Sequence, residues 1–173
     1  MATAVANWVE ESCGLVEARV FSLAAPLEAE SVPSALLTLE LECLHGMEEQ
    51  AAALSAAACS PAQAWRVLFA AASAGGAYNS GSYGAYGRLA AWRSLGALAG
   101  SPESSTFGAI EARARECIWH GFSAGTEWFA RVAWNIGLAA LSPDRRRLPY
   151  WLRPTPTDMC GTGGYPVVGR VIV

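Results

Sequence analysis

The sequence predicts an all-α fold, an irregular helical bundle for which a helical-repeat arrangement is the alternative. Two observations support this prediction. Alanine, which favours helices, dominates the composition, and apolar residues recur at three- and four-residue steps along most of the chain. With 173 residues, of which 53% are hydrophobic and 16% charged, the chain is long enough to bury one core. We therefore expect a single helical domain over residues 1–147 and an irregular tail, rich in proline and glycine, over residues 148–173.

The first third of the chain is predicted to form three helices. Apolar residues between Val5 and Leu23 recur at helical spacing and predict a helix over residues 3–24. The segment from Leu37 to Cys43 alternates as a strand does, yet its leucines also fit a helical stripe. Because leucine and alanine favour helix, we predict helices over 34–44 and 46–58, with a short strand over 37–43 as the alternative.

The middle of the chain carries the clearest helix boundaries. Ser60 and Gln63 have the spacing of a capping box, with Pro61 at the first helical position, and they predict a helix over 61–74. A second helix is expected over about 84–99, closed by Gly100. A third is indicated by the apolar stripe that runs from Phe107 to about residue 118.

The last third is predicted to contain one central helix and the tail. Residues 125–141 are apolar in nearly every direction around a helix, which predicts burial on most sides. From Pro143 onward, three arginines and several prolines disfavour helix. Only residues 167–173, VVGRVIV, have the composition of a strand, and they need a pairing partner in this chain or in another copy.

A short motif that recurs along the chain, here called the echo, bears on the helical-repeat alternative. Three similar triplets fall in predicted helices: Ala64-Trp65-Arg66, Ala91-Trp92-Arg93 and Ala133-Trp134-Asn135. Their spacings are unequal, whereas a true repeat keeps its period. The echo therefore favours an irregular bundle over a solenoid.

Composition and charge bear on location and partners. The first basic residue is Arg19, so the start of the chain lacks the pattern of a secretory signal peptide. The five cysteines are scattered without a CxxC pair, which predicts a reducing cytoplasm. A weakly charged stretch over 50–87 is interrupted by Pro61 and several glycines, so no membrane association is expected. A net charge of −3 attracts nucleic acid little, and no nucleic-acid partner is expected.

The glycine- and tyrosine-rich loop over residues 75–88 is the most distinctive candidate site. It leads into a predicted helix start, where backbone N–H groups attract anions and glycines let a ligand approach. Tyr78, Asn79 and Tyr83 would orient a phosphate or carboxylate, and Arg88 would supply a charged contact. The alternative is a tight connection whose tyrosines pack on neighbouring helices, because the loop has neither a P-loop lysine nor a GxGxxG motif.

Two Cys–His pairs are weaker candidates for chemistry. Cys43 with His45, and Cys117 with His120, offer the ligand types of a tetrahedral zinc site, or of a thiol nucleophile and its base. Their spacings match no known zinc module, and a buried cysteine beside a histidine at a helix end is the commoner arrangement. We therefore predict no metal and no cofactor, and the sequence identifies no catalytic residue.

Seven tryptophans are candidates for an apolar ligand pocket or a protein interface, because aromatic side chains supply a large contact area. Burial in the core is the alternative, and it is expected for most of them. The seven are Trp8, Trp65, Trp92, Trp119, Trp128, Trp134 and Trp151.

Two stretches carry a resemblance to known sequences. They are residues 77–100, AYNSGSYGAYGRLAAWRSLGALAG, and residues 117–147, CIWHGFSAGTEWFARVAWNIGLAALSPDRRR. Together they resemble an uncharacterised family, a domain of unknown function, from high-GC bacteria. The resemblance implies a shared domain and assigns no catalytic residue, because that family has no assigned activity. Residues 159–173 do not share it, so a truncated member and a divergent member are both compatible with the sequence.

These observations together favour a non-enzymatic interaction domain that self-associates or binds a protein partner. Apolar ends and abundant aromatic residues need covering, and no catalytic motif stands out. The alternative function is a small anion-binding or enzymatic site on the loop over 75–88. A ligand that stabilises the protein but fails to stabilise Arg88→Ala would favour that alternative.

Overall fold

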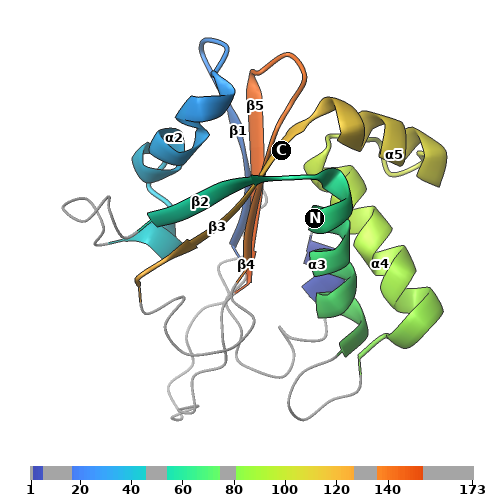
Figure 1. Cartoon of the computed structure of the whole chain (residues 1–173). Helices are drawn as coiled ribbons and strands as arrows, with labels where there is room; N and C mark the ends of the chain where they lie inside the picture. Colours follow the sequence, from blue (N-terminus) through green and yellow to red (C-terminus); the bar gives the residue numbers. More distant parts are fainter. Residues whose placement is uncertain (1, 6–16, 46–53, 75–80, 127–135, 154–173) are drawn as a thin grey trace.

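The computed structural model has an α/β fold, so the predicted all-α bundle is wrong (Figure 1). It describes residues 2–5, 17–45, 54–74, 81–126 and 136–153. In these residues a five-stranded antiparallel sheet has the strand order β1-β5-β4-β3-β2. The strands are β1 (Glu17–Ser22), β2 (Leu54–Cys59), β3 (Ile118–Ala124), β4 (Ile136–Leu141) and β5 (Arg147–Arg153).

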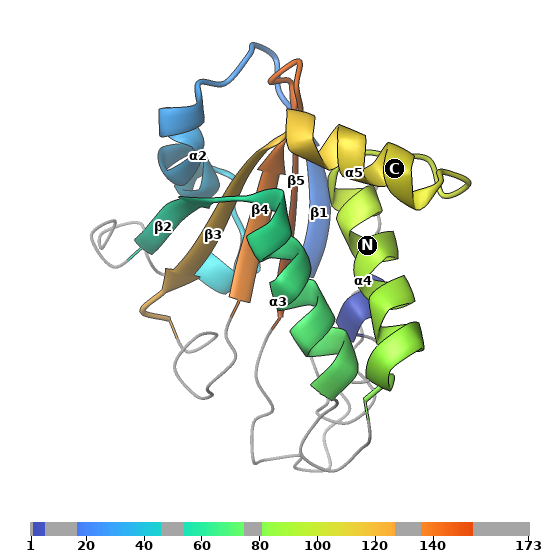
Figure 2. The ribbon, with the colours of Figure 1, turned by 45° about the vertical axis from the view of Figure 1, so that its right-hand side comes forward.

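Helices cover both faces of the sheet. One face, here called the α2 side, is covered by α2 (Val32–Thr38) and the 3-10 turn η3 (Glu42–Leu44). The 3-10 turn η2 (Ala29–Ser31) directly precedes α2. On the other, the α3–α4 side, lie α3 (Pro61–Ala74), α4 (Tyr83–Leu98) and the 3-10 turn η1 (Ala2–Val5). α5 (Phe107–Glu116) crosses the end of α4 (Figure 2). In this described part of the chain no helix has both the length and the apolar character needed to cross a membrane.

The sheet separates two apolar cores, because neighbouring residues of a strand point to opposite faces. In β4, Leu138 and Ala140 pack on the α3–α4 side, whereas Ala139 and Leu141 pack on the α2 side. A strand buried on both faces is apolar throughout. That is why residues 136–141 look apolar in every direction around a helix. The predicted central helix over 125–141 is wrong for these six residues, and residues 127–135 lie outside the described part.

Two further predicted helices are also wrong, and both fall on edge strands. Residues 17–22, within the helix predicted over 3–24, form β1 against β5. Residues 54–59, which overlap the helix predicted over 46–58, form β2 against β3. The patterns of such short segments fit both the helical and the strand period, so the available pairing partner decides the structure. Residues 6–16 and 46–53 lie outside the described part.

The helical-repeat alternative is wrong for the same reason as the bundle, since the sheet forms the centre of the fold. In the predicted irregular tail, residues 148–153 instead continue β5, which pairs with both β4 and β1. Residues 154–173 lie outside the described part, and with them the strand predicted over 167–173.

The helices predicted in the middle of the chain are confirmed. α3 has the predicted bounds and its capping box forms: the Gln63 N–H donates to Ser60 Oγ at 3.2 Å, and the Ser60 N–H donates to Gln63 Oε1 at 2.7 Å. α4 and α5 begin and end within two residues of their predicted bounds, and Gly100 follows α4 with a φ of 73°. The helix predicted over 34–44 is present as α2 up to residue 38, so the strand alternative over 37–43 is wrong.

A buried carboxylate fastens the α2 side to edge strand β1. Glu17, which is 8% exposed, accepts hydrogen bonds from the backbone N–H groups of Glu42 and Cys43, both at 3.2 Å. Arg19 lies 3.6 Å from the same carboxylate. A buried charge is tolerated when it is paired and hydrogen-bonded. These contacts hold the turn η3 against the edge of the sheet.

Candidate functional site

α3 and α4 lie side by side on the sheet, and small residues fill the space between them (Figures 1 and 2). A Cβ added at Gly87 of α4 would lie 3.2 Å from the Cβ of Ser73 on α3, so the two backbones approach closely there. Ala64 and Ala91 are completely buried in the same core. Trp65 and Phe69 of α3 and Trp92 of α4 are instead only half-buried.

Four aromatic rings form a continuous row across α3, α4 and α5. Phe69 stacks on Trp65 within α3, with ring centroids 5.1 Å apart. Trp65 lies 5.9 Å from Trp92 of α4, and Trp92 lies 5.8 Å from Phe107 at the start of α5. The first three rings are half-buried, and Phe107 is 53% exposed. Each such pair contributes about 0.5–1.5 kcal/mol beyond its buried area, so the row is held in a defined geometry.

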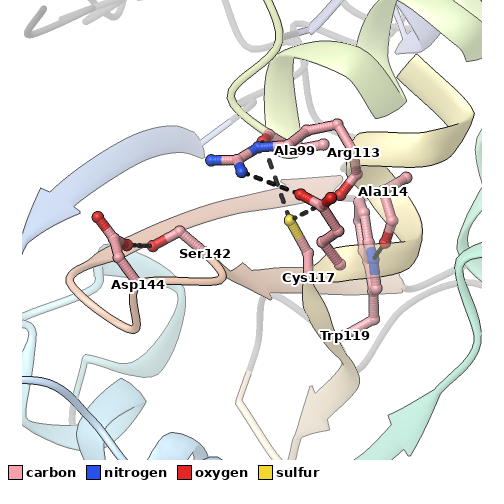
Figure 3. Close-up of polar contacts among 8 residues, drawn as sticks. Ala99, Arg113, Ala114, Cys117, Trp119, Ser142 and Asp144 are labelled. Atoms are coloured by element: carbon pink, nitrogen blue, oxygen red, sulfur yellow. Dashed lines mark hydrogen bonds and ion pairs between the residues drawn. The ribbon is translucent and has the colours of Figure 1, made fainter. Parts of the chain in front are cut away.

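Polar contacts at the C-terminal end of α5 hold this helix in place (Figure 3). They thereby fix the position of Phe107, the first residue of α5 and the last ring of the row. Arg113 donates from Nε to the carbonyl of Ala99 at the end of α4, at 3.3 Å. The Sγ of Cys117 lies 3.8 Å from the same carbonyl oxygen. Trp119 of β3 donates from Nε1 to the carbonyl of Ala114 at 2.7 Å. α5 is therefore tied both to α4 and to the sheet.

The helices that carry the row also carry exposed tyrosine and arginine side chains. Tyr86 on α4 is 76% exposed. Arg66 on α3, and Arg88 and Arg93 on α4, are also exposed and form no ion pair with a described side chain. Neither helix contains an acidic residue. We call this region the aromatic–arginine surface, made of Trp65, Arg66, Phe69, Tyr86, Arg88, Trp92, Arg93 and Phe107.

The predicted anion site over 75–88 is described only in part. Tyr78 and Asn79 lie outside the described residues. Tyr83 is the first residue of α4, with a φ of 49°, and its side chain is 65% exposed. Arg88 lies five residues further along the same helix and is exposed. Tyr86 is 76% exposed, so Tyr83 and Tyr86 are largely open to solvent, and both the anion site and a purely structural role of the loop stay predictions.

The four residues of the alternative zinc site are not brought together. Cys43 is buried in the core on the α2 side, and Cys117 is buried in the core on the α3–α4 side, so the sheet lies between the two thiols. His45 is exposed at the end of η3, whereas His120 is buried in β3. Within the described ranges, no three His, Cys, Asp or Glu side chains are grouped so that they could hold a metal ion.

The described cysteines are poor nucleophiles. Burial raises the pKa of the thiols of Cys43, Cys59 and Cys117 above the ordinary value, so all three stay protonated near neutral pH. Burial also lowers the pKa of His120. The geometry therefore does not favour the Cys–His nucleophile considered from the sequence.

Sequence reasoning assigned most tryptophans to the core, and this assignment holds for Trp119, which is 1% exposed. It did not foresee that Trp65 and Trp92 would meet in a half-buried row. A signal was present in the sequence, since residues 50–102 contain three arginines and no Asp or Glu. Two of those arginines follow Trp65 and Trp92 directly.

The comparisons with known proteins give a family but no activity. Residues 1–157 match the model of a family described as a family of unknown function, DUF6183. Because the match covers most of the chain, the chain belongs to this family, and the predicted resemblance to a domain of unknown function is confirmed. The predicted origin in high-GC bacteria stays a prediction. Neither a curated protein nor a solved structure matches the chain.

Proposed function

We propose that this member of DUF6183 is a non-enzymatic interaction domain that binds an acidic protein partner through the aromatic–arginine surface. The observation that carries the proposal is the row of Trp and Phe rings, on helices whose exposed side chains include Tyr86 and three arginines without a described ion-pair partner. The cores of protein interfaces are enriched in these residue types and depleted of Lys, Glu and Asp. Trp, Tyr and Arg also dominate the residues that carry most of the binding energy.

The ring row supports the proposal because it is ordered before a partner arrives. Ring contacts join Phe69, Trp65, Trp92 and Phe107, and the anchored α5 holds the last of them in place. Ordering a side chain on binding costs about 0.5–1.5 kcal/mol. Part of that cost is absent when the rings already pack against one another, so more of the contact energy is available for affinity.

Charge complementarity supports an acidic partner. Residues 50–102 carry three positive charges and no negative ones, although the whole chain has a net charge of −3. Carboxylates on a partner would pair with Arg66, Arg88 and Arg93, and a basic partner would be repelled. Nucleic acid is less favoured, because three arginines on an acidic protein neutralise few phosphates.

We also propose that the interaction takes place in the cytoplasm. The support is the chemistry of the described cysteines, since Cys43, Cys59 and Cys117 are all free thiols. Free, protonated thiols are typical of proteins in a reducing compartment.

Site-specific photo-crosslinking in the host cell tests the proposal. Tyr86, the most exposed aromatic residue of the surface, is replaced by the photoreactive aromatic p-benzoylphenylalanine. The same replacement at Glu30, exposed beside α2, is the control position. We expect one dominant adduct with an acidic protein from position 86 and none of the same mass from position 30. The yield should fall as salt rises, because salt screens charge pairs.

Two charge reversals make the test specific to the surface. Arg93→Glu places a negative charge next to Trp92 and should remove the adduct. Arg147→Glu makes the same change at an exposed position of β5, outside the surface, and should leave the adduct in place. An adduct with nucleic acid, no dominant adduct, or equal loss in both variants would contradict the proposal. An adduct between two copies of the chain would identify the partner as the chain itself.

A further inference from the structure

An open groove of about 270 Å³ lies between the start of α3 and the strands β2, β3 and β4. Its floor is hollow because two paired positions have almost no side chain: Ala57 of β2 lies opposite Gly121 of β3. A Cβ built on Gly121 meets no atom within 4 Å. Ala64 and Val67 of α3 line the groove on the helix side. The groove therefore has room for one or two apolar side chains from outside, since it approaches the lower size of known ligand pockets, about 300 Å³.

The strand beside the groove forms one edge of the sheet in the described part of the chain. β2 ends the strand order, and among the described residues it pairs only with β3. Natural edge strands usually carry charges, proline or a bulge, which prevent pairing with another chain. β2 has the sequence LSAAAC, and Ser55, Ala57 and Ala58 are exposed. The described strand therefore lacks the charges and proline that usually prevent an edge from pairing with another chain.

The chemistry of the groove selects an uncharged occupant. None of the described residues that line it carries a charge, and their polar groups are two hydroxyls, a thiol and an amide, from Ser55, Ser123, Cys59 and Gln63. The Gln63 side chain already accepts a hydrogen bond from the Ser60 N–H. A charged ligand would lose its hydration here without gaining an opposite charge. This environment is the reverse of the aromatic–arginine surface, so the two regions match different partners.

We propose that β2 and the groove bind an extended, uncharged polypeptide segment of another protein by strand addition. The segment pairs its backbone with the outer edge of β2. Its alternate side chains, which are apolar, reach over Ser55 and Ala57 toward Gly121. In this mode the backbone hydrogen bonds give affinity and the side-chain pocket gives sequence preference. The proposal does not depend on the acidic partner, because it uses a different surface.

Selection from a phage-displayed library of random decapeptides tests the proposal. The expected result on the full chain is enrichment of uncharged sequences that carry β-branched or other apolar residues at alternate positions. The most enriched peptide is then synthesised with a fluorescent label and titrated by anisotropy. A copy that is N-methylated at alternate amides cannot donate those hydrogen bonds to β2, and it should bind at least about tenfold more weakly.

Variants of the protein separate the groove from the rest of the strand. Gly121→Val fills the groove where an added side chain has space, and should weaken the peptide at least about tenfold. Ala57→Lys places a charge on the groove side of β2 and should do the same. Ala58→Ser is the control: it changes the neighbouring exposed position, which points to the other face, without adding a charge, and should change Kd by less than about twofold.

Each other outcome overturns the proposal. No enrichment, enrichment of charged peptides, or equal binding to wild type and Gly121→Val would show that the groove does not take such a segment. A dimer that Ala57→Lys dissociates, measured by light scattering, together with no selected peptide, would assign the edge to a second copy. Binding that survives N-methylation would assign the groove to a side chain or small apolar molecule without strand pairing.

Discussion

Replacing Gly137 with alanine tests the corrected structure of the segment 136–141 most directly. Gly137 lies opposite Phe122 in the β3–β4 pair, and a Cβ added there would come within 2.6–2.7 Å of three atoms of the Phe122 ring. Ordinary contacts between carbon atoms are about 3.5–4.0 Å, so the ring would have to move by about 1 Å. Phe122 is 4% exposed in the core on the α2 side, which leaves little room for such a movement.

The expected cost is in the upper part of the range for overpacked cores, about 2–3 kcal/mol. For a chain of this length, each kcal/mol corresponds to about 2–4 °C in Tm, so Gly137→Ala should lower Tm by about 4–12 °C. Urea unfolding followed by circular dichroism gives the free energy of unfolding directly. Gly121→Ala is the matched control on the neighbouring strand, where the added methyl meets nothing within 4 Å, and it should be neutral or stabilising by up to about 1 kcal/mol.

The sign of the effect separates the two structures considered for this segment. In a helix, glycine-to-alanine substitution would stabilise by up to about 1 kcal/mol. A stabilised Gly137→Ala, or a cost equal to that of Gly121→Ala, would refute the strand pairing and the clash with Phe122. If the clash is the cause, Phe122→Leu should recover at least about 1 kcal/mol in the Gly137→Ala background, measured as a double-mutant cycle.

Four further results are expected. Glu17→Gln should lower the free energy of unfolding by about 1.5–3 kcal/mol in urea titration, because the buried carboxylate accepts two backbone hydrogen bonds. Ser60→Ala should cost about 1 kcal/mol in the same assay, through loss of the cap on α3. Arg88→Ala should change it by less than about 0.5 kcal/mol, since the exposed side chain has no described ion pair. Burial lowers the pKa of His120 from 6.5, so the unfolded state takes up the proton first as the pH falls. The free energy of unfolding should therefore decrease below pH 6.5, and His120→Gln should reduce that decrease.

The candidate surface could be predicted in composition but not in arrangement. The arginines and the lack of acidic residues over 50–102 are visible in the sequence, as are the two Ala-Trp-Arg triplets. Contact between Trp65 and Trp92 depends on the close packing of α3 and α4, and contact between Trp92 and Phe107 depends on the crossing angle of α5. Neither follows from spacing along the chain. The groove beside β2 was missed altogether, because it requires Gly121 and Ala57 to be paired across two strands 64 residues apart (121 − 57 = 64).

The sequence by itself determined those helices whose start or end depends on capping residues close by in the chain. The capping box of Ser60 and Gln63 defines α3, and Gly100 ends α4, because caps act within one turn of the helix. Only the tertiary structure decided the strands. Residues 17–22, 54–59 and 136–141 are short segments whose patterns fit helix and strand alike, and a strand is stable only when a neighbouring strand satisfies its backbone hydrogen bonds and other elements cover its apolar side chains. Those partners come from distant parts of the chain, so local propensity favoured helix where long-range pairing gives a sheet.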